Sequence, residues 1–127
     1  MKEAIWTEHS PAPIGPYSQG IRSGDYVFVA GQGPMDQATG TVPDGIEAQT
    51  HQVLRNIRGI LEAAGGSLDD VVKVTAHLAD VSAFGAFNRV YAEYFRPPYP
   101  VRTTVGSQLP GILVEIDVIA EVRNKTS

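Results

Sequence analysis

The chain has 127 residues, of which 43% are hydrophobic and 19% charged, as expected for one globular domain spanning residues 1–127. A net charge of -4 with scattered basic residues weighs against nucleic-acid binding, and the absence of cysteine excludes disulfides, thiolate metal sites and a cysteine nucleophile. No segment approaches the roughly 20 apolar residues of a membrane span, and the first residues lack the apolar core of a signal peptide, so we predict a cytoplasmic protein that does not contact membranes.

The first predicted elements are two strands joined by a tight turn. The sequence Ser-Gly-Asp at 23–25 lies between two runs of strand-forming residues, which is a hairpin signal. It predicts strands near 18–22 and 26–31. The second of these strands is apolar on both faces, so neither face is expected to meet solvent.

A long helix follows the hairpin. Apolar residues recur at helical spacing from Ile46 to Ala64. Asp44 and Glu47 resemble a capping box at its start, and the pair Gly65-Gly66 is a strong stop signal at its end.

A third strand and a second helix come next. The segment 67–80 alternates apolar and polar residues, which predicts a strand. Aromatic residues at helical spacing then predict a helix over 82–95, with Ser82 as its N-cap and Pro97-Pro98 ending it. The apolar strand positions are Val72, Val74, Ala76 and Leu78, and the aromatic helix positions are Phe84, Phe87, Tyr91 and Tyr94.

Two last strands, near 101–107 and 112–122, complete an α+β domain with the order β-β-α-β-α-β-β. Two helices cover about one face of such a sheet, yet several of the strands are apolar on both faces. In the final strand one face is uniformly apolar, while the other combines apolar residues with Glu115 and Asp117. Such a mixed face suits a subunit interface, and we therefore predict a homo-oligomer with carboxylates near the seam.

Most candidate chemical groups favour a structural role. The three histidines, His9, His51 and His77, lack partners at metal-ligand spacing, and we expect no metal site. The sequence contains no G-x-S-x-G elbow, and the glycines at 30–34 match no nucleotide-binding loop. Gly31 could still let a ligand approach exposed backbone N–H groups.

Arg102 and Glu115 are the remaining candidates. Each alone is more often a solvated charge at a strand position. Together they provide an arginine that can bind a carboxylate and a carboxylate that can handle water, which is what the hydrolysis of a small acid requires.

Five segments in chain order resemble the RidA/YjgF reactive-intermediate deaminases, over about residues 5–122. They are "IGPYSQG" at 14–20, "VAGQGP" at 29–34, "FNRVYAEYF" at 87–95, "PVRTTV" at 100–105 and "VEI" at 114–116. The resemblance implies a chorismate-mutase-like fold with two helices on one face of the sheet, assembled as a homotrimer with active sites between subunits. It also implies hydrolysis of enamine and imine acids, such as 2-aminoacrylate or 2-iminopropanoate, to 2-keto acids and ammonia without a cofactor.

The resemblance further assigns roles to five residues. It implies that Arg102 binds the substrate carboxylate, that Glu115 handles water and that Tyr17 flanks the substrate. Gly31 matches a backbone contact with the substrate, and Asn88 matches the family's asparagine after an aromatic position.

Three departures from the family bear on substrate choice. Ala30 stands where many members that act on 2-aminoacrylate have serine, Thr104 stands where they have cysteine, and the segment 103–114 is shorter. A pathway-specific enamine acid of the 2-aminomuconate type is therefore an alternative to small 2-imino acids. Two other classes also stay open: a non-catalytic module that binds small carboxylates, and the nuclease or translation-inhibitor activity attributed to some members.

Overall fold

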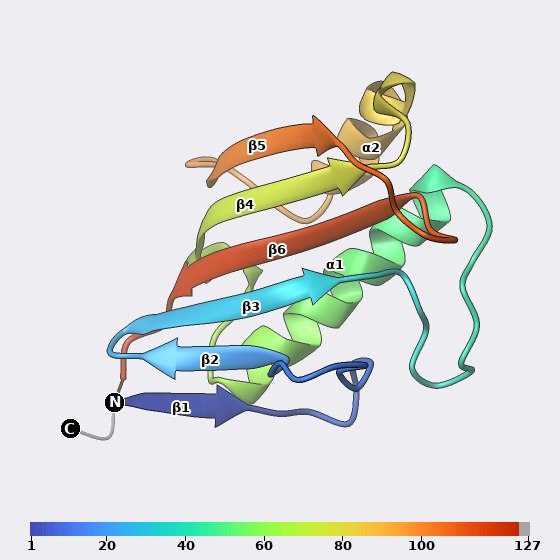
Figure 1. The fold of residues 1–127 in the computed structure, drawn as a ribbon. Coiled ribbons are helices and arrows are strands. Elements are labelled where there is room, and N and C mark those ends of the chain that lie inside the picture. The colour runs from blue at the N-terminus through green and yellow to red at the C-terminus, as the bar shows by residue number, and fades with distance from the viewer. Residues whose placement is uncertain (125–127) are drawn as a thin grey trace.

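Six strands form one sheet in the computed structural model, which describes residues 1–124 (Figure 1). Across the sheet the strands lie in the order β1-β2-β3-β6-β4-β5, and β4 and β5 are the parallel pair. The strands are β1 (Lys2–Ile5), β2 (Gly20–Ser23), β3 (Tyr26–Gln32), β4 (Val71–Leu78), β5 (Val101–Gly106) and β6 (Val114–Glu121). The helices are α1 (Ile46–Ala63) and α2 (Phe84–Tyr91), with short 3-10 turns η1 (Leu68–Asp70) and η2 (Val81–Ala83).

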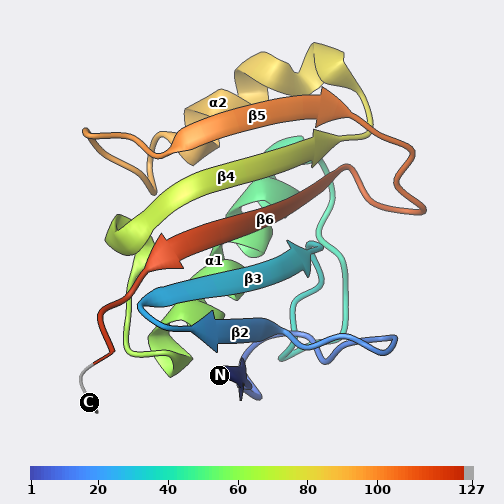
Figure 2. The same cartoon turned by 60° about the vertical axis from the view of Figure 1, so that its left-hand side comes forward.

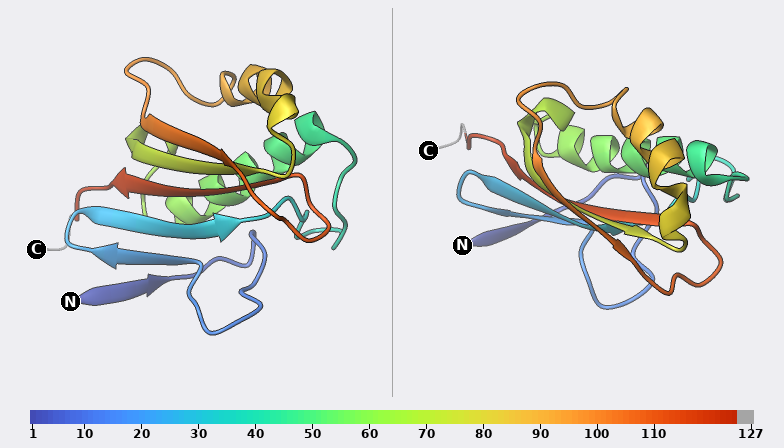
Figure 3. Two further views of the ribbon diagram at one scale, coloured as in Figure 1. Left: turned by 45° about the horizontal axis from the view of Figure 1, so that its top comes forward. Right: turned by 90° about the horizontal axis from the view of Figure 1, so that it is seen from above.

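This architecture confirms the predicted α+β fold with two helices on one face of the sheet. Both helices lie on the same side of the strands in every view (Figures 2 and 3). The predicted order lacked one element, because β1 pairs with β2 at the edge of the sheet. The residues of β1 are largely exposed and show no apolar alternation, so the sequence carried little signal for this strand.

The core fills the space between the sheet and the helices. β6 alternates buried apolar residues with half-buried ones, and α1 supplies one apolar stripe. Fully burying such a side chain contributes roughly 1.5–3 kcal/mol. The fully buried residues of α1 that face the sheet are Val53, Leu54, Ile57, Ile60 and Leu61.

The other face of the sheet, which we call the open face, has no covering layer among residues 1–124. Large apolar side chains are exposed on it, including Phe28 at 44% and Val105 at 39%. The prediction of strands that are apolar on both faces is therefore confirmed, whereas the expectation that neither face meets solvent is wrong for a single chain, because its two helices cover one face alone.

Three local predictions were wrong. Val72 is 43% exposed and Val71 is buried in its place, because the register of β4 against β6 shifts between Val71 and Lys73. Gly45, at φ 87°, caps α1 without any side-chain bond from Asp44.

The start of the second helix also differs from the prediction. Ser82 is not its N-cap: Ala83 takes that position, and the side chain of Asp80 caps η2 by accepting from the Ser82 backbone N–H. The predicted stop at Gly65 is confirmed, with φ 86° and a bond from the Gly66 N–H to the Leu61 carbonyl.

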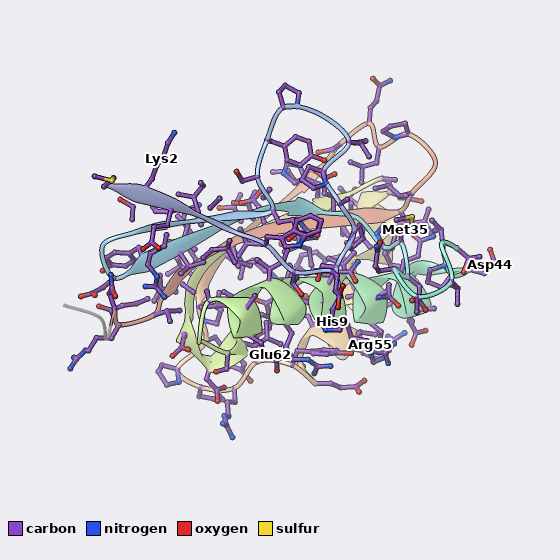
Figure 4. The ribbon with its side chains drawn as sticks, turned by 90° about the horizontal axis from the view of Figure 1, so that it is seen from below. Lys2, His9, Met35, Asp44, Arg55 and Glu62 are labelled. Carbon is purple, nitrogen blue, oxygen red and sulfur yellow. The ribbon has the colours of Figure 1, made fainter. Side chains whose placement is uncertain are left out.

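Two buried amide side chains of α1 fix the loops at one end of the sheet. Asn56 Nδ2 donates to the carbonyls of Gly33 and Met35, over 3.0 and 2.9 Å. The Gln49 side chain accepts from the Leu113 backbone N–H over 2.8 Å. Figure 4 shows Met35 and Asp44 at this end of the molecule. α1 therefore fixes the backbone just after β3 and just before β6.

No helix in the described part of the chain combines the length and apolar character needed to cross a membrane.

Candidate functional site

Arg102 lies on β5 against aromatic rings of α2. It pairs in register with the buried Val74, so its side chain points to the helix-covered face. Its guanidinium carbon is 4.5 Å from the ring centre of Tyr91, 5.2 Å from that of Phe87 and 5.6 Å from that of Phe84. These are cation–π distances, and they hold the half-buried guanidinium against α2.

The polar partner of Arg102 is an uncharged amide. Its Nη2 donates to Oδ1 of Asn88 over 2.7 Å. Among residues 1–124, no carboxylate oxygen lies within the 4.0 Å of an ion pair. A partly desolvated cation without a counter-charge favours an anionic ligand, because such a ligand supplies the missing charge.

Glu115 occupies the second candidate position, on β6. Its neighbours Val114 and Ile116 are buried under the helices, so Glu115 projects toward the open face. A Cβ added at Gly31 would lie 2.8 Å from its Oε2. Only glycine therefore leaves room for the Glu115 carboxylate beside β3.

The predicted residues thus form two groups, on opposite faces of the sheet. Arg102 and Asn88 meet on the helix-covered face, which we call the cationic half-site. Glu115 and Gly31 meet on the open face, which we call the acidic half-site. A single chain does not bring Arg102 and Glu115 together. The resemblance implied active sites between subunits, but the placement of these two residues on opposite faces of the sheet was not predicted.

The other predicted residues flank these half-sites. Thr104 is half-buried and in register with the buried Ala76, two positions from Arg102 on the same face. The Ala30 N–H donates to the Gln19 carbonyl over 2.9 Å, next to Gly31. Tyr17 is 48% exposed, and its hydroxyl accepts from the Ile14 N–H over 3.2 Å.

The sequence did not reveal that the aromatic stripe of α2 contacts the Arg102 guanidinium as well as the core. Phe84, Phe87 and Tyr91 were expected only as an apolar face. Burial raises the pKa of the Tyr91 hydroxyl above its ordinary value of 10.0, although the charge of Arg102 and the hydrogen-bonding groups of its nearby guanidinium act in the opposite direction. The position of Asn88 within this stripe was the available signal, because a polar residue between core aromatics needs a partner.

No group of three or more His, Cys, Asp or Glu side chains within residues 1–124 could hold a metal ion. Two histidines have hydrogen-bond partners instead. His51 bonds the Tyr94 hydroxyl over 2.7 Å, and His77 bonds the Ser107 hydroxyl over 2.8 Å.

Comparisons with known proteins match almost the whole chain. The family model described as Endoribonuclease L-PSP matches residues 7–122. A RutC family protein of Pyrococcus horikoshii is 54% identical over 123 residues, covering 94% of this chain and 98% of that protein. The 2-iminobutanoate/2-iminopropanoate deaminase of Salmonella typhimurium is 39% identical over 125 residues, covering 94% and 98% of the two chains.

Solved structures agree with the fold. RidA from the Antarctic bacterium Psychrobacter sp. superposes with a TM-score of 0.91 at 41% identity, covering 94% of this chain and 99% of that chain. The crystal structure of E. coli TdcF with bound serine gives a TM-score of 0.90 at 37% identity, covering 96% and 99%.

Proposed function

The chain belongs to the RidA/YjgF family, described by its family model as Endoribonuclease L-PSP, and on that premise we propose that it hydrolyses small enamine and imine acids to 2-keto acids and ammonia. Relatives named as imine and reactive-intermediate deaminases support this class of activity. The observation that carries the proposal is the cation of Arg102, which is half-buried, held by three rings and without a carboxylate partner among residues 1–124. It suits a substrate that brings its own carboxylate.

In the proposed reaction Arg102 binds and orients the substrate acid. Its planar fork can engage both carboxylate oxygens, and Asn88 holds one edge of the guanidinium. The enamine first tautomerises to the imine. The bound cation then draws electron density from the C=N carbon, which water attacks.

Glu115 would act on the water. Its carboxylate takes a proton from the water as the oxygen bonds to the imine carbon and passes that proton to the nitrogen, giving a neutral tetrahedral carbinolamine. The carboxylate then takes the remaining hydroxyl proton and delivers it to the nitrogen, so that the C–N bond breaks, the C=O bond forms and ammonia leaves. Tyr17 and the backbone at Gly31 would flank the substrate, with no cofactor required.

A complete site would need a second copy of the chain. The cationic and acidic half-sites lie on opposite faces of one sheet, and the open face exposes apolar side chains such as Phe28. Both features support a homotrimer in which Arg102 of one copy meets Glu115 of its neighbour.

Mixed trimers test this assembly. Arg102→Ala and Glu115→Gln chains are each expected to be inactive alone. When they are co-expressed, a site between copies can recombine an intact arginine with an intact glutamate, and activity should return. If it does not return although the chains co-purify, the site does not lie between copies.

Small 2-imino acids such as 2-iminopropanoate are the first substrate candidates. A 2-aminomuconate-type acid from aromatic catabolism is the alternative, since Ala30 and Thr104 change the size and polarity of the pocket beside the two half-sites. Freshly generated 2-aminoacrylate and 2-aminomuconate should both be tried. If both decay at the uncatalysed rate in the presence of the protein, the deaminase proposal fails.

A non-catalytic carboxylate-binding module is the second candidate. It is favoured by the fact that a single chain does not bring Arg102 and Glu115 together. Tight binding of 2-oxobutanoate without turnover of either enamine would support this binding module.

Ribonuclease activity is disfavoured by the net charge of -4. RNA cleavage that persists in an Arg102→Ala variant would favour the ribonuclease alternative again. A cytoplasmic location stays a prediction.

A further inference from the structure

The Tyr91 hydroxyl is the one buried side-chain polar atom without a hydrogen-bond partner among residues 1–124. The residue is only 7% exposed. A buried hydroxyl that makes no bond destabilises the fold relative to phenylalanine, which fills the same space without a polar atom. The cost of this unbonded hydroxyl is explained if the hydroxyl forms a hydrogen bond when the protein binds a ligand.

The surroundings of Tyr91 indicate that Arg102 is the hydrogen-bond partner of its hydroxyl in the ligand-bound protein. Among the three rings that contact the guanidinium, Tyr91 is the nearest, at 4.5 Å. Its other ring neighbours are apolar: Phe95 stacks on it at 4.5 Å and Phe87 lies at 5.6 Å. Arg102 is therefore the polar group in position to meet this hydroxyl.

One edge of the Arg102 guanidinium is bonded to Asn88. A carboxylate that takes two guanidinium N–H groups must turn the fork toward itself, and this changes which N–H groups face α2. An acceptor on the α2 side can then fix the new orientation. Burial also keeps Tyr91 in the neutral hydroxyl form, with a lone pair free to accept.

We propose that Tyr91 is a positioning residue of the cationic half-site, whose hydroxyl accepts an N–H from Arg102 when a carboxylate ligand is bound. This inference rests on the proposed function for the identity of the ligand. It adds a residue that acts through Arg102 and does not itself touch the substrate.

The test compares Tyr91→Phe with Tyr94→Phe. Tyr94 lies three residues further along the chain, and its hydroxyl already has a partner in His51. Both variants remove one hydroxyl and keep the ring. Affinity for 2-oxobutanoate is measured by calorimetry, turnover of 2-aminoacrylate by steady-state kinetics, and stability by the melting temperature.

Tyr91→Phe should raise the Kd for 2-oxobutanoate and the KM by about tenfold, with kcat within about twofold of wild type and a melting temperature that is unchanged or higher. Tyr94→Phe should lower the melting temperature and leave both constants unchanged. A weaker ligand affinity in a protein that is no less stable cannot come from a merely structural hydroxyl.

An unchanged Kd in Tyr91→Phe overturns the proposal, whatever happens to its stability. This outcome differs from failure of the proposed function. If the wild-type protein binds 2-oxobutanoate but turns over no enamine, the deaminase proposal fails, while the Kd of Tyr91→Phe still decides the role of Tyr91.

Discussion

The two half-sites differ in how much of each is built within one chain. Arg102 is enclosed by three aromatic rings and an amide, and it needs only an anion. Glu115 lies on an uncovered face, where the notable neighbour is a glycine that leaves it room. Under the proposed function, recognition of the acid is therefore preorganised within the chain, whereas the chemical step depends on assembly.

Removing the cation should have the largest effect. Arg102→Ala is expected to lower kcat/KM by about a thousandfold or more, because the substrate carboxylate loses its charged partner. Steady-state kinetics measure this, and Arg89→Ala is the control, since Arg89 forms an exposed ion pair with Glu47. Retained activity in Arg102→Ala would show that the cationic half-site does not bind the substrate.

Glu115→Gln should separate binding from chemistry. We expect kcat to fall by about a hundredfold or more, because the amide cannot take the proton of the attacking water. The Kd for 2-oxobutanoate should stay close to that of wild type. Unchanged turnover would show that water is activated elsewhere.

Gly31→Ala tests whether the acidic half-site depends on open space beside β3. The new methyl group would lie 2.8 Å from Glu115 Oε2 and displace the carboxylate, so kcat should fall by about tenfold. Gly85→Ala is the matched control, because nothing lies within 4 Å of a Cβ added there. Equal activity in both variants would contradict a tightly positioned Glu115.

Asn88→Asp would sharpen the description of the cationic half-site. The new carboxylate should pair with Arg102 and compete with the substrate, raising KM by about tenfold with little change in kcat. Asn88→Ala only removes one hydrogen bond and should raise KM less, by about threefold. An alanine variant with the larger rise would mean that Asn88 mainly supports the fold.

The smallest effect concerns stability at high pH. Burial raises the pKa of Tyr91 in the folded state, so above pH 10.0 the unfolded chain loses this proton more readily than the folded chain. Tyr91 should therefore contribute a loss of stability as the pH rises from 10.0 through its folded pKa, and none below. Denaturant midpoints at about pH 8 and about pH 11 should differ less in Tyr91→Phe than in wild type. An identical loss in both proteins would contradict the burial effect.

The sequence predicted the parts of the fold that are recorded in local patterns. The 23–25 turn, the apolar stripe of α1 and the stop at Gly65 were read correctly, because each depends on residues close together in the chain. Strand β1 and the register shift at Val71 were missed, since both depend on pairing with a distant strand.

The site was predicted less completely than the fold. Arg102 and Glu115 were each placed on the right strand, and β5 and β6 were expected. The face of Glu115 follows from the alternation of the final strand, as predicted. The face of Arg102 depends on its register with Val74 of the neighbouring strand, and the local pattern of β5 does not fix it. The enclosure of Arg102 could not be predicted either, because it arises where α2 packs over the edge strand β5 and local sequence patterns do not record such a tertiary contact.

The clamp that Asn56 forms on Gly33 and Met35 has a consequence for how this protein can be altered. Beyond the clamp the chain forms a small exposed turn, with Asp36 bridged to Thr41 and Gly40 at φ 72°. Because the backbone is fixed before this turn begins, a peptide tag or a reporter domain inserted at its tip should leave Gly31 in place. The turn is therefore a natural attachment point for labelling individual copies within an assembly.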